Sequence, residues 1–88
     1  MKILFFGAIW CKDCNVMRPL WRSMKLENPN LEVQYFDVDK HKKYCKTFNI
    51  IDVPTVIFID KKGKELERCS GIKHREFIID LIKKYKNL

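Results

Sequence analysis

Hydrophobic residues are spaced along the chain in two ways, one typical of buried strands and one typical of amphipathic helices. An uninterrupted apolar run over Lys2–Gly7 predicts a strand that is buried on both faces. From Cys11 to about Glu27 the apolar residues recur at helical spacing, which predicts a helix with one buried side. Pro19 lies inside this helix and is expected to kink it, and Asn28-Pro29-Asn30 is expected to end it.

The remainder of the chain continues the alternation of strand-like and helix-like segments. Each segment is short and is bounded by charged or turn-forming residues. In chain order we predict a strand over Leu31–Asp37, a short helix over Lys40–Phe48, a buried strand over Pro54–Asp60, a tight turn at Lys61-Lys62-Gly63, a strand over Lys64–Cys69, a break at Ser70-Gly71 and an amphipathic helix over Lys73–Tyr85.

The predicted order of elements, βαβαββα, indicates an α/β protein. A strand–helix–strand crossover makes the first two strands parallel, whereas the hairpin at Gly63 makes the last two antiparallel. The four-stranded sheet is therefore expected to be mixed. Eighty-eight residues correspond to one small domain, so we expect a single domain over residues 1–88.

Composition and charge narrow the classes of function. The net charge of +7 comes from lysine and arginine residues spread along the chain, which favours a solvated surface over a nucleic-acid interface, although the charge can steer acidic partners. The apolar start lacks a small-residue cleavage site, and no segment approaches the ~20 apolar residues of a membrane span. We therefore expect a cytoplasmic protein, without membrane or nucleic-acid partners, whose four cysteines are mostly reduced.

The pair Cys11 and Cys14 is the strongest chemical signal in the sequence. It lies between the end of a predicted strand and the first turn of a predicted helix. Free backbone N–H groups and the helix dipole at this position stabilise a thiolate, which is the species that attacks disulfides. We expect Cys11 to attack a disulfide in another molecule and Cys14 to resolve the mixed disulfide. Lys12 adds positive potential beside Cys11, and Asp13 opposes it.

The same cysteine pair could supply half of a zinc site, in which case the other ligands would have to come from the remaining cysteines or histidines. Cys45 and Cys69 are 24 residues apart and have no partner at zinc-knuckle spacing. His41 precedes Cys45 by four residues, a spacing that on a helix would bring both toward one metal. The alternative is that both cysteines are small buried apolar residues. We expect no metal.

Several further motifs occur at widely separated positions. They are Phe6-Gly7-Ala8-Ile9-Trp10-Cys11 with Cys14, Pro19, Asp37-Val38-Asp39, Val53-Pro54-Thr55, Lys62-Gly63 and Ser70-Gly71. Together they resemble the thioredoxin family over about Lys2–Ile82. The resemblance implies a thioredoxin-like three-layer sandwich and a cis peptide bond before Pro54. It also implies that Trp10 and Pro54 frame the dithiol.

The resemblance further implies a substrate groove beside the dithiol. Its expected residues, besides Trp10, are Ile51, Asp52, Val53, Gly71 and Ile72. The backbone of Val53 is expected to pair with an extended substrate segment. Asp52 is an unusual charge at this place, and we expect it to select basic or polar substrates and to disfavour the Cys11 thiolate.

Three features depart from the family pattern. The chain starts directly at the active-site strand, without the usual first strand and helix. Phe5 occupies the position of a buried aspartate that assists the resolving cysteine, and Tyr35 lies near the position of its lysine partner. Lys12-Asp13 replaces the usual Gly-Pro, which leaves the reduction potential undetermined.

The function implied by the resemblance is the reduction of protein disulfides in electron transport and cell redox homeostasis. Such a protein needs no cofactor beyond its own reversible Cys11–Cys14 disulfide. Its expected partners are disulfide-containing proteins and an electron donor of the thioredoxin-reductase type, and it is expected to be a monomer. The alternatives are a disulfide oxidase or isomerase, a glutaredoxin-like reductase, and a metal-binding or interaction module on the same scaffold.

Overall fold

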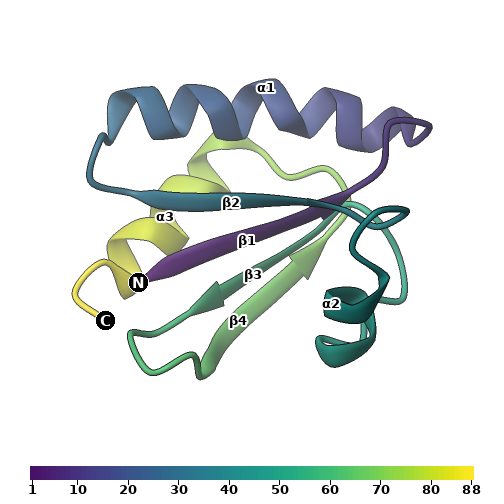
Figure 1. Ribbon diagram of the computed structural model, residues 1–88. Coiled ribbons are helices and arrows are strands. Elements are labelled where there is room, and N and C mark those ends of the chain that lie inside the picture. Colours follow the sequence, from purple (N-terminus) through teal and green to yellow (C-terminus); the bar gives the residue numbers. More distant parts are fainter.

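A four-stranded sheet in the order β2-β1-β3-β4 forms the middle layer of the computed structural model, which describes all residues from 1 to 88 (Figure 1). The elements occur in the predicted order. Their bounds are β1 Lys2–Gly7, α1 Lys12–Glu27, β2 Glu32–Asp37, α2 Lys42–Thr47, β3 Thr55–Ile59, β4 Glu65–Ser70 and α3 Arg75–Tyr85.

The sheet is mixed, which confirms the prediction from the order of elements. Strand β1 is parallel to β2 and antiparallel to β3, and β3 is antiparallel to β4. The register pairs Gly7 with Asp37 and Phe6 with both Phe36 and Thr55. The carboxyl ends of β1 and β2 therefore lie at the same end of the sheet as the start of β3. The cysteine pair follows β1 at this end.

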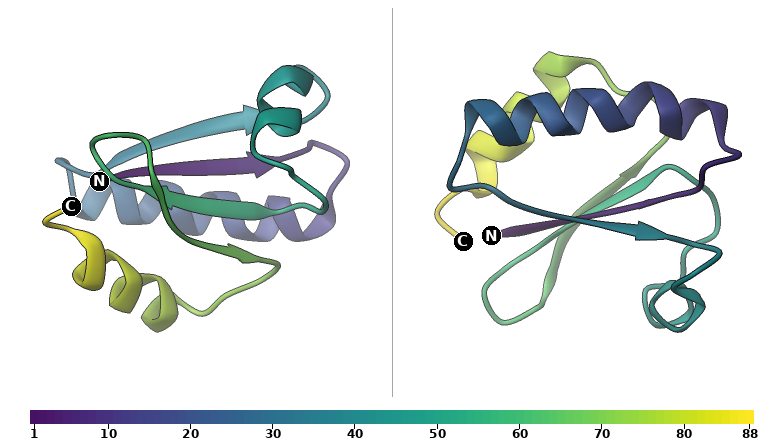
Figure 2. Two further views of the ribbon diagram at one scale, coloured as in Figure 1. Left: turned by 90° about the horizontal axis from the view of Figure 1, so that it is seen from below. Right: turned by 45° about the horizontal axis from the view of Figure 1, so that its top comes forward.

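The two faces of the sheet are covered unequally. Helices α1 and α3 cover one face, and the short α2 lies against the other face near one end (Figures 1 and 2). The larger core cluster, which contains Trp21 of α1 and Phe5 of β1, lies under α1 and α3. A smaller cluster that includes Phe6 and Phe36 packs against α2. The central strands β1 and β3 are apolar on both faces because both faces of the sheet are covered there.

The structure corrects the bounds of the second helix, which is shorter than the predicted Lys40–Phe48. The N–H groups of Lys40 and His41 both donate to the carbonyl oxygen of Asp37, so these residues form a turn and α2 begins only at Lys42. The third strand likewise begins at Thr55 rather than Pro54, since proline has no N–H for a strand ladder. No helix of the structure is long and apolar enough to cross a membrane.

Candidate active site

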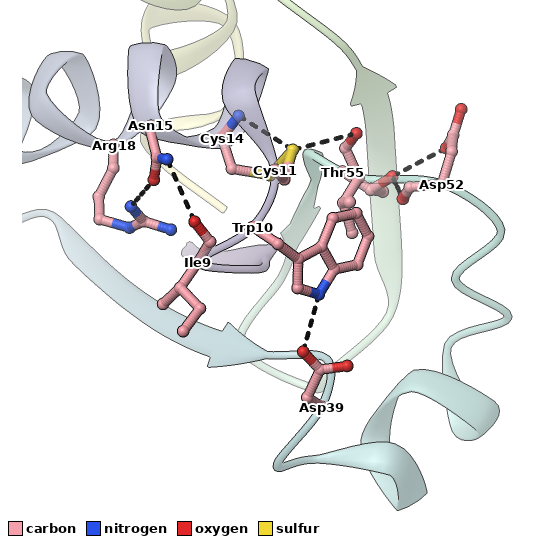
Figure 3. Close-up of a disulfide and its surroundings, with 10 residues drawn as sticks. Ile9, Trp10, Cys11, Cys14, Asn15, Arg18, Asp39, Asp52 and Thr55 are labelled. Atoms are coloured by element: carbon pink, nitrogen blue, oxygen red, sulfur yellow. Dashed lines mark hydrogen bonds between the residues drawn. A yellow bond between two sulfur atoms is a disulfide. The ribbon is translucent and has the colours of Figure 1, made fainter.

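Cys11 is the N-cap residue of α1, and its position follows from the way β1 ends. Its backbone is extended, with φ −88° and ψ 114°, and its Sγ accepts a hydrogen bond from the N–H of Cys14 at 3.1 Å (Figure 3). The free N–H groups of the first helical turn thus point toward this sulfur, and the positive end of the helix dipole lies beside it. A position of this kind favours the thiolate form of a reduced cysteine, which is the form that the sequence predicts for Cys11.

The two cysteines form a disulfide in the structure, with their Cα atoms 5.2 Å apart. Cys11 keeps 7% of its surface exposed, whereas Cys14 is completely buried. A disulfide in another molecule can therefore reach the sulfur of Cys11 more easily than that of Cys14. The arrangement favours Cys11 as the attacking sulfur.

Gly7 provides the space that Cys14 occupies. A Cβ atom at Gly7 would lie 3.3 Å from Cys14 Sγ and 2.8 Å from the ring atom Cε1 of Phe5. A side chain at Gly7 would therefore displace the ring of Phe5 in the same strand and crowd Cys14 of the helix. In the sequence Gly7 was interpreted only as the boundary of a strand, and its contact with Cys14 depends on tertiary packing.

The segment before the cysteines is held by the helix that follows them. Asn15 donates from Nδ2 to the carbonyl oxygen of Ile9 at 3.2 Å, and Arg18 donates to Asn15 Oδ1 at 2.7 Å (Figure 3). The N–H of Cys11 also donates to the carbonyl oxygen of Ala8 at 3.2 Å. These bonds fix the turn that presents Trp10 and Cys11, and nothing in the local sequence pattern singled out Asn15.

The Val53–Pro54 segment lies opposite the disulfide. Its peptide bond is cis. Cys11 Sγ lies 3.8 Å from the carbonyl oxygen of Val53. The carbonyl oxygen of Pro54 accepts from the N–H of Gly71 at 2.9 Å, and Gly71 adopts a positive φ of 79° that suits glycine. The structure thus brings Val53 to Cys11, with Pro54 next to it in the chain and Gly71 bonded to Pro54.

Trp10 presents its indole ring to the solvent beside the disulfide, with 67% of the residue exposed. Its Nε1 donates to Asp39 Oδ2 at 2.8 Å, which fixes the orientation of the ring (Figure 3). The N–H of Asp39 in turn donates to Asp37 Oδ1 at 2.9 Å. In the sequence, Asp39 is part of the motif Asp37-Val38-Asp39, but nothing there predicts its bond to Trp10.

The predicted docking residues separate into two places. Trp10, Ile51, Asp52 and Val53 line one apolar groove of about 390 Å³, and Ile51 is 95% exposed. Gly71 and Ile72 do not line this groove. They lie beyond Pro54, and Ile72 is exposed. The groove also includes three residues that the sequence analysis did not select as docking residues, namely Val38, Cys45 and Ile50.

The charged residues near the dithiol have different surroundings. Lys12 and Asp13 are exposed in the first turn of α1. Asp52 is exposed at the groove, but both its carbonyl oxygen and its Oδ1 accept from Thr55 Oγ1, at 2.7 and 3.2 Å (Figure 3). Its carboxylate therefore has a local structural contact besides any influence on substrates.

Cys45 and Cys69 are free thiols. No group of three or more His, Cys, Asp or Glu side chains is placed so that it could hold a metal ion. Burial raises the pKa of both thiols. The nearby carboxylates of Asp37 and Asp39 raise the pKa of Cys45 further. Both cysteines pack against the core clusters, which is the small-apolar-residue alternative of the sequence analysis.

Comparisons with known proteins agree with this geometry. A family model described as thioredoxin matches residues 1–82. The chain is 31% identical to a thioredoxin of Chlamydia pneumoniae, over 97% of this chain and 82% of that protein. It is 30% identical to a thioredoxin of Chlamydia trachomatis, over 98% and 83% of the two chains.

Solved structures give the same result for the fold. Thioredoxin 1 of Thermosipho africanus superposes with a TM-score of 0.85 at 28% identity, covering 99% of this chain and 96% of that one. A thioredoxin of Nicotiana alata superposes with a TM-score of 0.86 at 29% identity, covering 94% and 70% of the two chains.

Proposed function

Because the chain belongs to the thioredoxin family and is a thiol–disulfide oxidoreductase that reduces protein disulfides, we propose that Cys11 is its nucleophile and Cys14 its resolving thiol. The observation that supports these roles is the difference in exposure between the two residues. Cys11, at the N-terminus of α1, reaches the surface, and Cys14 is buried beneath it.

The proposed reaction has two exchange steps. The Cys11 thiolate attacks one sulfur of a protein disulfide, an S–S bond forms between Cys11 and the substrate, and the other substrate sulfur leaves as a thiolate. The Cys14 thiol then loses its proton and attacks Cys11 Sγ. The Cys11–Cys14 disulfide forms, the second substrate sulfur leaves, and the substrate has gained two electrons. The structure described here corresponds to the oxidised end of this cycle.

The surroundings of the dithiol are assigned roles in binding the substrate. Trp10 and Pro54 frame the approach to Cys11, and the carbonyl group of Val53, 3.8 Å from Cys11 Sγ, marks where an extended substrate backbone would pair. Ile51 and Asp52 would contact the substrate on one side of Pro54, and Gly71 and Ile72 on the other. Lys12 and Asp13, both exposed beside Cys11, would adjust the stability of its thiolate with opposite signs.

The proposal extends to partners and compartment. A reductase of the thioredoxin-reductase type would return electrons to the Cys11–Cys14 disulfide, which serves in place of a bound cofactor. The protein would act as a monomer in the cytoplasm, in electron transport and redox homeostasis, without membrane or nucleic-acid partners. A reduction potential near that of other thioredoxins, about −270 mV, is expected. A much higher value would contradict the reducing direction.

The experiment that tests the roles is the reduction of insulin disulfides by dithiothreitol, followed by turbidity. Cys11→Ser is expected to reduce the rate to that of dithiothreitol alone, because Cys14, the other thiol at the helix N-terminus, is completely buried. Cys45→Ser is the matched control, since Cys45 lines the groove but lies away from the helix N-terminus, and it should keep most of the activity. Normal activity of Cys11→Ser would disprove the assignment.

A second measurement separates the two cysteines and identifies the substrates. Cys14→Ser is expected to accumulate mixed disulfides on Cys11, because the first step proceeds and the second does not. Non-reducing electrophoresis followed by mass spectrometry would identify the trapped proteins. If the trapped species are attached to Cys45 or Cys69 instead, Cys11 is not the nucleophile.

A further inference from the structure

The second exchange step requires a group that takes the proton of Cys14, and the immediate surroundings of this residue offer none. Cys14 has no exposed surface. The residues of β1 on the side of α1 are Ile3, Phe5 and Gly7, none of which has a side chain that can accept a proton. A general base must lie within hydrogen-bond reach of the proton or reach it through a water molecule.

Asp37 lies on the neighbouring strand at the level of Gly7. The two residues are paired in the parallel register of β1 and β2. Two pairs earlier, Phe5 and Tyr35 contact each other with ring centroids 5.5 Å apart, and Phe5 belongs to the cluster beneath α1. Because side chains alternate along a strand, Asp37 projects toward α1, the side on which Cys14 is buried.

The separation between Asp37 and Cys14 follows from two distances. A Cβ at Gly7 would lie 3.3 Å from Cys14 Sγ. Neighbouring strands lie about 4.8 Å apart, so the Cβ of Asp37 is about that far from the Gly7 position. A water molecule bonded to both the carboxylate and the sulfur would span about 5.5 Å, the length of two hydrogen bonds. The Cβ of Asp37 therefore lies within about 8 Å of Cys14 Sγ, and a carboxylate that points toward α1 leaves a gap that one water molecule can bridge.

A cleft of about 300 Å³ provides the route. Its lining includes Gly7 and Phe5 on one side and Asp37 and Tyr35 on the other. The backbone of Gly7 and the ring edge of Phe5 form the wall between this cleft and Cys14. The cleft is large enough and polar enough to hold water. Once Cys14 is released from Cys11 in the mixed disulfide, rotation of its side chain would bring Sγ to this wall.

The carboxylate of Asp37 is available for this role. Its Oδ1 accepts from the N–H of Asp39, and no protein group bonds to its Oδ2. The other titratable or charged side chains in the cleft come from α1, β2 and the turn before α2, and they are Arg18, Tyr35, Lys40 and His41. His41 is less suitable, because its ring packs edge-on against Phe36, which belongs to the cluster on the opposite face of the sheet.

We propose that Asp37 accepts the proton of Cys14, through water in this cleft, during resolution of the mixed disulfide; the inference rests on the proposed roles of the two cysteines. The proton leaves Cys14 Sγ for the carboxylate of Asp37. The thiolate then attacks Cys11 Sγ, the Cys11–Cys14 bond forms, and the substrate sulfur leaves as a thiolate. Asp37 later returns its proton to the solvent.

The sign of the effect distinguishes a proton acceptor from a simple electrostatic neighbour. A negative charge near Cys14 disfavours the Cys14 thiolate. If Asp37 acted only through its charge, Asp37→Asn would make the thiolate more available and resolution faster near pH 7. If Asp37 accepts the proton, the same substitution makes resolution slower. The asparagine keeps an oxygen that can accept from the N–H of Asp39, so the turn is retained.

The test is a stopped-flow reaction of the fully reduced protein with excess dithionitrobenzoate, recorded as release of thionitrobenzoate from pH 6 to pH 9. Attack by Cys11 gives a phase that scales with reagent concentration. Resolution by Cys14 gives a concentration-independent phase, whereas direct reactions of Cys45 and Cys69 scale with concentration. Asp37→Asn is expected to slow only the concentration-independent phase, by about tenfold at pH 7 and less at high pH, where hydroxide replaces the base.

Three variants serve as controls. Asp37→Glu keeps a carboxylate and should recover part of the rate. Glu32→Gln removes a carboxylate at the other end of β2, and His41→Gln removes the other candidate base; both should leave the concentration-independent phase unchanged.

Each remaining outcome contradicts a specific claim. An unchanged or faster second phase in Asp37→Asn, equal slowing of both phases, or slowing in His41→Gln to the same degree would overturn the role of Asp37. If the wild-type protein has no concentration-independent phase, Cys14 does not resolve the mixed disulfide, and the proposed function fails together with this inference.

Discussion

The four cysteines form two sets with opposite surroundings. Cys11 and Cys14 lie at the N-terminus of a helix, where N–H groups point at Cys11 Sγ. Cys45 lies in α2 against the smaller core cluster, and Cys69 lies in β4 against the larger one, on the other side of the sheet. Cys45 and Cys69 therefore cannot pair with each other in this fold.

The difference shows that the position of a thiol relative to backbone dipoles and carboxylates decides its chemistry. Burial raises the pKa of Cys45 and Cys69, and the carboxylates near Cys45 add to the effect. The cap position has the opposite influence, because it favours the charged form. Four residues of one type thus divide into a disulfide pair at a helix N-terminus and two free thiols that pack against the core clusters.

The largest expected contrast is in alkylation of the reduced protein by iodoacetamide at pH 7. Cys11 is expected to react at least about tenfold faster than Cys69, because a helix N-terminus favours a thiolate whereas burial raises the pKa of Cys69. Cys45 should also react slowly, although it is partly exposed. Peptide mass spectrometry over time would give the individual rates, and equal rates for Cys11 and Cys45 would remove the distinction drawn here.

The packing around the disulfide pair can be broken at Gly7. Gly7→Ala is expected to lower the free energy of unfolding by about 1–3 kcal/mol, because the new methyl group overlaps the Phe5 ring and crowds Cys14. Urea denaturation of the oxidised protein measures this. Gly71→Ala is a useful comparison, since its Cβ meets no atom within 4 Å and only its positive φ opposes the change. If Gly7→Ala costs no more than Gly71→Ala, the close approach is not limiting.

A smaller effect is expected for Cys69. Cys69→Ala should lower the free energy of unfolding by about 1 kcal/mol through lost packing, and insulin reduction should stay within about twofold of the wild-type rate. Chemical denaturation and the insulin assay on the same preparation would check both values. A large loss of activity with unchanged stability would show that Cys69 takes part in the redox cycle.

The smallest expected effect is a pH dependence of stability. The pKa of Cys69 is raised in the folded protein, so on going to high pH the unfolded chain releases its proton first. The contribution of this thiol to stability is complete below the pKa of the unfolded chain, about 8.5, and is lost as the pH rises through the folded value. The decline above this pH should be less steep in Cys69→Ala, and identical pH profiles would contradict the assignment.

Most of the fold followed from the sequence because local signals and tertiary structure agree. The strand–helix–strand order over β1, α1 and β2 predicts the parallel pair, and the turn at Gly63 predicts the antiparallel one. The second helix was predicted too long, because His41 looks helical in the sequence while its N–H and ring both lie against the carbonyl oxygen of Asp37.

The site was predictable only where residues lie close together in the sequence or match a family motif. The roles of Cys11 and Cys14 could be argued from spacing alone, and Pro54 required the resemblance. Three features of the site join segments that are 7 to 30 residues apart. They are the contact of Gly7 with Cys14, the bond from Trp10 to Asp39 and the pairing of Asp37 with Gly7. They depend on strand register and on the placement of the helix, which the local pattern does not specify.

Arg68 anchors the loop that leads to the groove, which matters for any redesign of the groove. Its guanidinium group donates to the carbonyl oxygens of Phe48 and Asn49 at the end of α2 and bonds twice to Glu65 at 2.7 Å. It therefore ties the segment that leads to Ile51 and Val53 to strand β4. A library that varies residues 50 to 52 to retarget the groove can accept many sequences as long as Arg68 and Glu65 are kept, because the anchor of this loop lies outside the part that is varied.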